Sequence, residues 1–171
     1  RVTHFGTSAK FLASLAKQDV SVAHRFSLDA LSMILSTGSP LLPVQFDYIH
    51  NHIKANIPIC SISGGSDIVS CFALGSPLSP IYRGELACFG LGMDIGVVNE
   101  QGQTVIDEKG ELICRRAFPS MPLYFWNDPD GTKFSAAYFE RFEGVWAHGD
   151  YGEITDRGSM IIYGRSDAVL N

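Results

Sequence analysis

Residues 146–171 read WAHGDYGEITDRGSMIIYGRSDAVLN, and their pattern predicts a β-hairpin. Two runs of alternating character, Tyr151–Thr155 and Met160–Tyr163, flank the turn cluster Thr155–Ser159. Alternation with a period of two is typical of strands, and a glycine-bearing cluster between two such runs is typical of the turn that joins them. We therefore expect the two runs to pair antiparallel about a turn centred near Arg157.

The predicted pairing brings an acidic and a basic side chain to the open end of this hairpin. Asp150 is expected opposite Gly164 and therefore next to Arg165. Gly149 and Gly164 stand beside the two charges and leave room for another group to approach. A carboxylate can accept both hydrogen bonds of a vicinal diol, and a guanidinium can support the same sugar from its other side. The simpler interpretation, an exposed ion pair that contributes about 0–1 kcal/mol, stays open at this point.

The first part of the chain predicts three strands separated by two helices. The expected strands are Val2–Phe5, the end of Leu28–Ser36, and Ile59–Ile62. The expected helices are one that is capped by Ser8 and runs to about Lys17, and one over Pro43–Ala55. A βαβαβ order predicts a parallel sheet with right-handed crossovers.

Three polar loops follow the predicted strands. They are Gly6–Ser8, Ser36–Pro40 and Ser63–Asp67. Because the carboxyl ends of parallel strands meet at one edge, we expect these loops to lie together where open α/β sheets bind ligands. In the third loop, the Ser66 hydroxyl and the Asp67 carboxylate would suit a magnesium ion shared with a nucleotide phosphate. The alternative for this loop is a turn whose Ser and Asp cap the next element.

The pattern changes after Gly75–Pro80, so we expect an α/β segment over 1–80 and a β-rich, barrel-like subdomain over 81–171. The expected strands are Glu85–Phe89, Met93–Asn99, Gln103–Ile106 and Glu111–Arg115, followed by a helix that is capped by Thr132 and runs to about Phe142. The predicted fold class is therefore α/β: a βαβαβ parallel-sheet segment followed by short strands in period two.

Composition limits the partners. A net charge of −5 and a pI near 5.4 argue against a nucleic-acid partner. The sequence contains no apolar run of 18 residues, so it does not predict membrane insertion. We expect small-molecule partners.

The four cysteines, Cys60, Cys71, Cys88 and Cys114, stand in apolar runs without metal-ligand spacing. Such buried thiols fit a reducing, cytoplasmic compartment.

Four motifs resemble those of the adenylate-forming acyl-CoA synthetase superfamily, in the same order. Ser36–Pro40 resembles S-G-[GA]-x-P, Ser63–Asp67 resembles Y-G-x-T-E, His148–Asp150 resembles T-G-D, and Gly164–Asp167 resembles G-R-x-D. This chain has Ser and Asp in place of the usual Thr and Glu of the second motif, and His in place of the Thr of the third. Both departures are similar to the forms found in members that activate a small β-keto acid, and the resemblance runs over essentially the whole chain.

The resemblance implies an enzyme that activates a small β-keto acid with ATP, releases pyrophosphate and passes the acyl group to coenzyme A. ATP or AMP, Mg²⁺ and coenzyme A would be its ligands. The implied residue roles are adenine contacts at Gly38, Ser39 and Pro40, nucleotide and phosphate contacts at Gly64, Gly65 and Ser66, a magnesium ligand at Asp67, ribose contacts at Asp150 and Arg165, and a hinge at Asp167.

The same resemblance places two required parts outside these residues. The phosphate loop should precede Arg1, and the catalytic lysine should follow Asn171, in a C-terminal domain beyond the hinge. We therefore expect no catalytic residue within the chain, no activity from it alone, and self-association through uncovered apolar strands. Two alternatives remain: a related synthetase for another small carboxylic acid, and a catalytically silent nucleotide-binding or interaction module.

Overall fold

The chain passes three times between two structural units. The computed structural model describes residues 1–167. One unit contains residues 1–63 and 74–88, and the other contains residues 64–73 and those from 89 onward. The motif Ser63–Asp67 therefore lies almost wholly in the second unit, although the sequence places it directly after the parallel strands.

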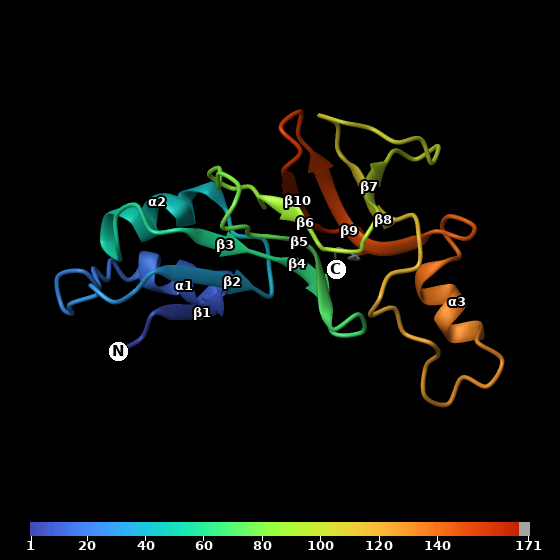
Figure 1. Cartoon of the computed structure of the whole chain (residues 1–171), viewed down its shortest axis with the longest axis horizontal. Helices are drawn as coiled ribbons and strands as arrows, with labels where there is room; N and C mark the ends of the chain where they lie inside the picture. The colour runs from blue at the N-terminus through green and yellow to red at the C-terminus, as the bar shows by residue number, and fades with distance from the viewer. Residues whose placement is uncertain (168–171) are drawn as a thin grey trace. The chain divides into compact units, whose positions relative to one another are not determined.

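The first unit contains the predicted parallel sheet. Strands β1 (His4–Ser8), β2 (Met33–Thr37) and β3 (Ile59–Ser61) pair in this order, and both pairings are parallel. Helices α1 (Ala9–Lys17) and α2 (Pro43–His52) connect successive strands (Figure 1). The predicted βαβαβ segment is confirmed, with α2 ending three residues earlier than expected.

The core of this unit joins both helices to the sheet. Leu12 of α1, Ile49 of α2 and Ile34 of β2 are each 0% exposed and belong to one buried cluster. Burial of such side chains contributes roughly 1.5–3 kcal/mol each. Ile59 of β3 belongs to the same cluster, so the apolar surface that we expected near Ile59–Ile62 is covered at this residue by the unit's own core, whereas Val2 is 64% exposed.

The strand ends differ from the prediction in one respect. Gly6, Thr7 and Ser8 continue β1 instead of forming a loop, because they pair with residues 35–37 of β2. Ser8 still caps α1, since its Oγ accepts a hydrogen bond of 3.1 Å from the N–H of Phe11. Ser36 and Thr37 likewise belong to β2, and the chain turns only at Gly38, where φ is +84°.

The second unit is built mainly from antiparallel strands. Four strands pair in the order β10-β9-β8-β7 and three in the order β4-β5-β6, the last of which begins at the boundary between the units. Their bounds are β4 Ser63–Gly65, β5 Ser70–Leu74, β6 Cys88–Phe89, β7 Ile95–Val98, β8 Gly110–Cys114, β9 Trp146–Ile154 and β10 Met160–Arg165. Gln103–Ile106, expected as a strand, contributes only a single bridge from Thr104 to Val98.

Trp146 is the centre of an aromatic core in this unit. It is 1% exposed and stacks on Tyr138, with ring centroids 3.6 Å apart and planes 12° apart. Tyr138 ends helix α3 (Thr132–Tyr138). Rings that contact Trp146 edge to face come from Phe118, Phe134 and Phe139. This stacking holds α3 against β9.

Asp128, not Thr132, caps helix α3. Its two carboxylate oxygens accept hydrogen bonds from the N–H groups of Lys133 and Phe134, at 3.0 and 2.9 Å. The N-cap position itself is Gly131, with φ +70° and no side chain to offer. Lys133 and Phe134 are the second and third residues of the helix, whose N–H groups an N-cap side chain would otherwise bind, so Asp128 takes the role that was expected of Thr132.

The hairpin of residues 146–165 forms as predicted, but a bulge changes its register. Met160 pairs with Ile154 and Ile162 with Gly152, as a turn at Arg157 requires. The register then shifts by one residue, so that Arg165 lies directly opposite Asp150. The sequence had placed Gly164 there. A bulge adds one residue to one strand, and here it aligns the two charges.

Candidate functional site

The two charged residues of the hairpin form an ion pair. Nη1 of Arg165 lies 3.3 Å from Oδ1 of Asp150. The side chain of Asp150 is 12% exposed and that of Arg165 is 48% exposed, so the pair has one sheltered and one accessible partner. The predicted pairing of these residues is confirmed, and their role toward a ligand stays a prediction.

Arg165 also binds Asp167. Its Nε donates to Oδ1 of Asp167 at 2.8 Å, and its Nη2 donates to Oδ2 of the same carboxylate. The bonds from Arg165 hold the pKa of the Asp167 carboxyl below its ordinary value. The guanidinium is therefore shared between Asp150 and Asp167, the residue for which the resemblance implies a hinge role.

Gly149 occupies a position where a side chain would be strained. Its φ is +80°, in the left-handed region that favours glycine. A Cβ at this residue would lie 2.6 Å from Nη2 of Arg165 and 2.9 Å from Oδ2 of Asp167. A side chain at the residue before Asp150 would therefore strain the backbone and displace the guanidinium and the carboxylate from these positions.

A buried carboxylate binds the backbone beside the Asp150–Arg165 pair. Glu111 of β8 is 2% exposed. Its Oε1 accepts a hydrogen bond of 3.0 Å from the N–H of Gly149, and its Oε2 accepts one of 2.5 Å from Nη1 of Arg141. Arg141 also reaches Oγ of Ser166 at 3.5 Å, and the N–H of Ser166 donates to the carbonyl of Gly149 at 2.8 Å.

His148 joins two of the motifs of this unit, His148–Asp150 and Ser63–Asp67. It is 6% exposed, its Nδ1 lies 3.4 Å from Nε1 of Trp146, and its Nε2 lies 3.2 Å from the carbonyl oxygen of Gly64. The indole N–H can only donate, so Nδ1 accepts and Nε2 carries the proton. Burial lowers the pKa of His148 below its ordinary value, although the charge of Asp150 opposes the shift. A neutral imidazole therefore bridges β9 and β4.

The glycines of Ser63–Asp67 have structural reasons to be glycine. A Cβ at Gly64 would lie 2.2 Å from the carbonyl oxygen of Ser70, and one at Gly65 would lie 2.9 Å from Cε1 of His148. Ser63, Gly64 and Gly65 form strand β4 and so are not a loop. Because only four residues join β4 to its neighbour β5, the two strands run antiparallel.

Asp67 lies in the turn after β4, where it is exposed. The hydroxyl of Tyr138 donates a hydrogen bond to its Oδ2. Burial, and then this bond, raise the pKa of Tyr138. Among residues 1–167, no group of three or more His, Cys, Asp or Glu side chains could hold a metal ion. Asp67 therefore offers one carboxylate, which fits magnesium only if phosphate oxygens complete the coordination.

The adenine-side residues of the sequence prediction belong to the first unit. Gly38, Ser39 and Pro40 follow β2, between Thr37 and the start of α2. The N–H of Leu42, just before α2, donates to Oε1 of Gln45 at 2.7 Å, and Nε2 of Gln45 donates to the carbonyl of Ala9 at 2.6 Å. This buried glutamine ties the end of the loop to the start of α1.

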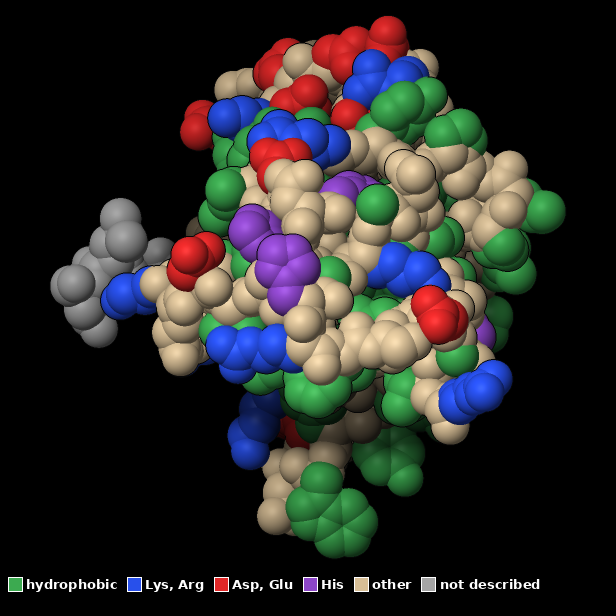
Figure 2. Space-filling view, turned by 90° about the vertical axis from the view of Figure 1, so that its left-hand side faces the viewer, with side chains coloured by type: hydrophobic (Ala, Val, Ile, Leu, Met, Phe, Trp, Pro, Cys, Tyr) green, Lys and Arg blue, Asp and Glu red, His purple; other side chains and the backbone are tan. Residues whose placement is uncertain are grey.

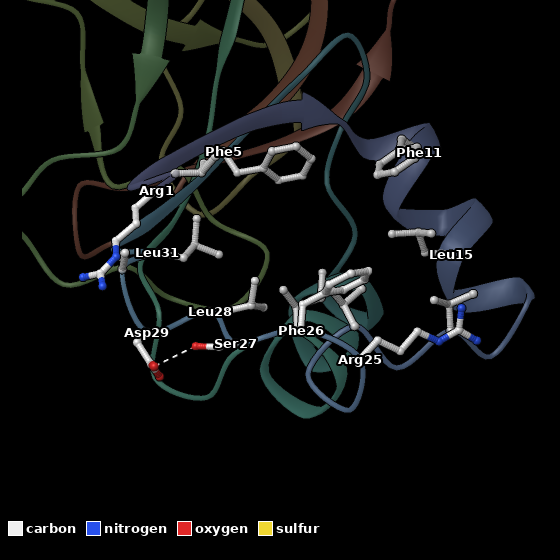
Figure 3. Close-up of a pocket in the computed structure, with 15 residues that line it drawn as sticks. Arg1, Phe5, Phe11, Leu15, Arg25, Phe26, Ser27, Leu28, Asp29 and Leu31 are labelled. Atoms are coloured by element: carbon white, nitrogen blue, oxygen red, sulfur yellow. Dashed lines mark hydrogen bonds between the residues drawn. The ribbon is translucent and has the colours of Figure 1, made fainter.

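The first unit also contains an apolar cavity of about 690 Å³. Figure 3 shows the side chains of Phe5, Phe11 and Leu15 along one side of it and Phe26 across from them. Arg1 and Arg25 also line the cavity. None of the residues that the sequence assigns to nucleotide or magnesium lines it.

Charged side chains of both signs lie on the surface. On the face shown in Figure 2, Lys and Arg side chains are interspersed with Asp and Glu side chains. No helix among residues 1–167 has both the length and the apolar character needed to span a bilayer.

Sequence reasoning missed three side chains that shape this region: Glu111, Arg141 and Tyr138. The one available signal was Glu111 itself, a carboxylate within the predicted strand Glu111–Arg115; in the structure all five residues of β8 are buried. A buried Glu needs a partner. The sequence did not indicate which residue supplies it.

No protein-family model matches the chain. Individual proteins do match it. The acetoacetyl-coenzyme A synthetase of Rhizobium meliloti (strain 1021) is 53% identical over 171 residues, which are 100% of this chain and 26% of that protein. The acetoacetyl-CoA synthetase of Xenopus tropicalis is 46% identical over 171 residues, which are 99% of this chain and 25% of that protein. The chain thus spans about a quarter of the length of these relatives.

Two solved structures have the same fold. The acetoacetyl-CoA synthetase from Streptomyces lividans matches with a TM-score of 0.87 and 43% identity, over 99% of this chain and 27% of that one. An anthranilate CoA ligase in complex with anthranoyl-AMP matches with a TM-score of 0.77 and 21% identity, over 99% of this chain and 30% of that one. The expected fold class and the expected resemblance are both confirmed.

Proposed function

We propose that the chain is part of an acetoacetyl-CoA synthetase, an AMP-forming acid–CoA ligase. The whole protein would activate acetoacetate with ATP, release diphosphate, and transfer the acetoacetyl group to coenzyme A with release of AMP. The observation that carries the proposal is the similarity of the entire chain to acetoacetyl-CoA synthetases. The motif forms of this chain, which depart from the usual ones at Ser66, Asp67 and His148, agree with it.

The ribose of the nucleotide would be held by Asp150 and Arg165. The carboxylate of Asp150 accepts hydrogen bonds from sugar hydroxyls, and Arg165 remains accessible to donate to the same ligand. Support comes from the bulge that aligns the two residues and from Gly164, where an added Cβ would meet no atom within 4 Å.

Gly38, Ser39 and Pro40 would contact adenine, and Gly64, Gly65 and Ser66 would contact the phosphates. Asp67 would hold Mg²⁺, which would offset the negative charge of the triphosphate when bound. Support for Asp67 is its exposed carboxylate, oriented by the hydroxyl of Tyr138. Asp67→Asn keeps this shape and removes the charge, so half-maximal activity should require more magnesium. An unchanged magnesium titration would return Asp67 to a turn-capping role.

Asp167 would lie at the hinge between the two half-reactions. It is 59% exposed and bound by Arg165, so rotation of the backbone at this residue would change a contact of the ribose-binding guanidinium.

A cytoplasmic location agrees with four free thiols, since burial raises the pKa of Cys60, Cys71 and Cys114 and keeps them protonated. The exposed side chains of Val2 and Phe5 would favour self-association of the isolated segment.

The direct test is acid-dependent ATP–pyrophosphate exchange by the intact protein. Acetoacetate should support exchange far better than acetate, butyrate or anthranilate, and coenzyme A should then yield acetoacetyl-CoA. A preference for another acid would identify a related synthetase, and no exchange with any acid would identify a silent module. Residues 1–171 alone should give no exchange, because the groups that stabilise the departing pyrophosphate are expected outside them.

A further inference from the structure

Glu111 is placed to act on both halves of the Asp150–Arg165 pair at once. One of its oxygens accepts the N–H of Gly149, the residue before Asp150. The other accepts Nη1 of Arg141, whose guanidinium reaches Oγ of Ser166, the residue after Arg165. A single carboxylate therefore contacts the backbone beside one charge and, through one arginine, the side chain beside the other.

The backbone at these two neighbours is also joined directly. The N–H of Ser166 donates to the carbonyl of Gly149 at 2.8 Å. Gly149 has a left-handed φ of +80°, so its N–H and carbonyl point in directions that the regular pairing of β9 does not set. Glu111 satisfies the N–H and Ser166 satisfies the carbonyl, which leaves the orientation of Asp150 determined by contacts on both sides of Gly149.

Burial makes these contacts strong and selective. The side chain of Glu111 is 1% exposed, so water cannot replace its partners, and hydrogen bonds to a charged acceptor are stronger than those between neutral groups. A buried carboxylate without its donors would have a high free energy. The carboxylate and its donors therefore keep one geometry.

We propose that Glu111 is a positioning residue for ribose recognition: through Gly149 and Arg141 it sets the geometry in which Asp150 and Arg165 meet the sugar hydroxyls. The proposal rests on the proposed function, because it requires that this pair bind ribose. Because the side chain of Glu111 is 1% exposed, it would act through these neighbours and not by contact with the nucleotide. Its removal should reduce discrimination between nucleotides that differ in their sugar hydroxyls, and should change the binding of adenine and phosphates much less.

The experiment compares ATP with 3′-deoxy-ATP and 2′-deoxy-ATP in calorimetric binding to the intact protein. The wild-type protein should prefer ATP to the less favoured deoxy analogue by roughly tenfold or more, the size expected for a hydrogen bond to a charged group. The ratio of the affinity for ATP to the affinity for this analogue should fall to near one in Asp150→Ala. Glu111→Ala should lower the same ratio by most of that factor and should change the affinity for the deoxy analogue itself less.

Two further variants separate positioning from general damage. Glu111→Gln keeps the shape and can still accept the N–H of Gly149 but loses the charge that binds Arg141, so its ratio should fall between those of Glu111→Ala and the wild type. This variant also serves if Glu111→Ala does not fold. Glu153→Gln is the matched control, because Glu153 lies on the same strand as Asp150 and its carboxylate binds the hydroxyl of Tyr163 at 2.8 Å instead. Its ratio should equal that of the wild type.

The outcomes are distinct. If the wild type shows no preference for ATP, or if Asp150→Ala keeps the preference, ribose binding by this pair is wrong and the proposed function loses its main geometric support. If Asp150→Ala removes the preference and the Glu111 variants keep it, only the positioning role is wrong. If Glu111→Ala lowers the affinities for ATP and both analogues equally, Glu111 supports the fold and not the recognition. In the background of Asp150→Ala, Glu111→Ala should have no further effect on the ratio.

Discussion

Two arginine–carboxylate pairs, one in each unit, differ in where the carboxylate lies. Arg83 binds Asp47 in the first unit with two bonds, of 2.7 Å from Nε and 2.6 Å from Nη2. Arg141 binds Glu111 in the second unit with one bond of 2.5 Å. The side chains of Arg83 and Asp47 are 58% and 46% exposed, whereas those of Arg141 and Glu111 are 49% and 1% exposed.

The difference shows that the number of bonds does not measure the importance of an ion pair. Either partner of Arg83–Asp47 can return to water when the other is removed, so little free energy depends on the pair. Glu111 cannot do so, because its carboxylate is enclosed by the second unit. Loss of its partner would leave a buried charge with fewer donors.

The largest expected effect is the loss of Arg141. Arg141→Ala should reduce the free energy of unfolding by about 3–5 kcal/mol, because it leaves the buried carboxylate of Glu111 without its cation. Glu111→Gln should cost less, since it removes the buried charge and leaves a half-exposed arginine that water can solvate. Urea unfolding of the intact protein, followed by tryptophan fluorescence, measures both. Equal costs for the two variants would contradict the asymmetry between the partners.

Loss of Asp150 should affect ligand binding more than stability. Asp150→Ala should weaken ATP binding by about 1–3 kcal/mol, since sugar hydroxyls are left without an acceptor in a closed site. The unfolding midpoint should change less than in Arg141→Ala, because Arg165 keeps its two bonds to Asp167. Calorimetric titration with ATP and a parallel urea series test the two statements. Wild-type affinity in Asp150→Ala would rule out a ribose contact at this residue.

His148 should give the second unit a pH-dependent stability. Burial lowers its pKa in the folded protein below the value of about 6.5 that it has when unfolded. Below that pH the unfolded chain therefore binds more protons than the folded protein. The contribution of His148 to the free energy of unfolding is complete above that pH and should be lost as the pH falls from 7 toward 5. His148→Asn should show a smaller fall in the urea midpoint over this range than the wild type. His24→Asn, which changes an exposed histidine, is the control and should keep the wild-type profile.

The smallest effect is expected for the exposed pair. The bond from Arg83 holds the pKa of Asp47 below its ordinary value, yet both side chains are solvated. Arg83→Gln and Asp47→Asn should each leave the urea midpoint within experimental error of the wild type, and equally so at 1 M salt. A cost for Arg83→Gln as large as that for Arg141→Ala would show that burial of the carboxylate is not what separates the two pairs.

Much of the architecture was predictable from local patterns. Helix spacing up to Lys17 and over residues 43–55 predicted the two helices of a parallel βαβαβ segment, and period-two alternation in residues 151–163 predicted the hairpin. These predictions succeeded because each depends on residues close together in the chain. Motif order also identified Asp150 and Arg165, which the structure brings together.

The details that the sequence missed depend on residues far apart in the chain. Glu111 binds groups 30 and 38 positions away, and Asp67 binds the hydroxyl of Tyr138, 71 positions away. The capping of α3 by Asp128 was missed because a loop, not a helical spacing, returns this carboxylate to the helix. The bulge before Gly164 was missed because alternation alone assumes a regular ladder.

The sequence by itself determined the helices and parallel strands of the first unit, the hairpin turn and the motif residues, because periodicity and turn chemistry act over a few neighbouring residues. Tertiary structure alone decided that Arg165 faces Asp150, that His148 is neutral and binds Gly64, and that Glu111 holds Gly149. The physical reason is burial. Once a polar group is removed from water it must bind whichever partner the fold brings within about 3 Å, and that partner can come from any part of the chain.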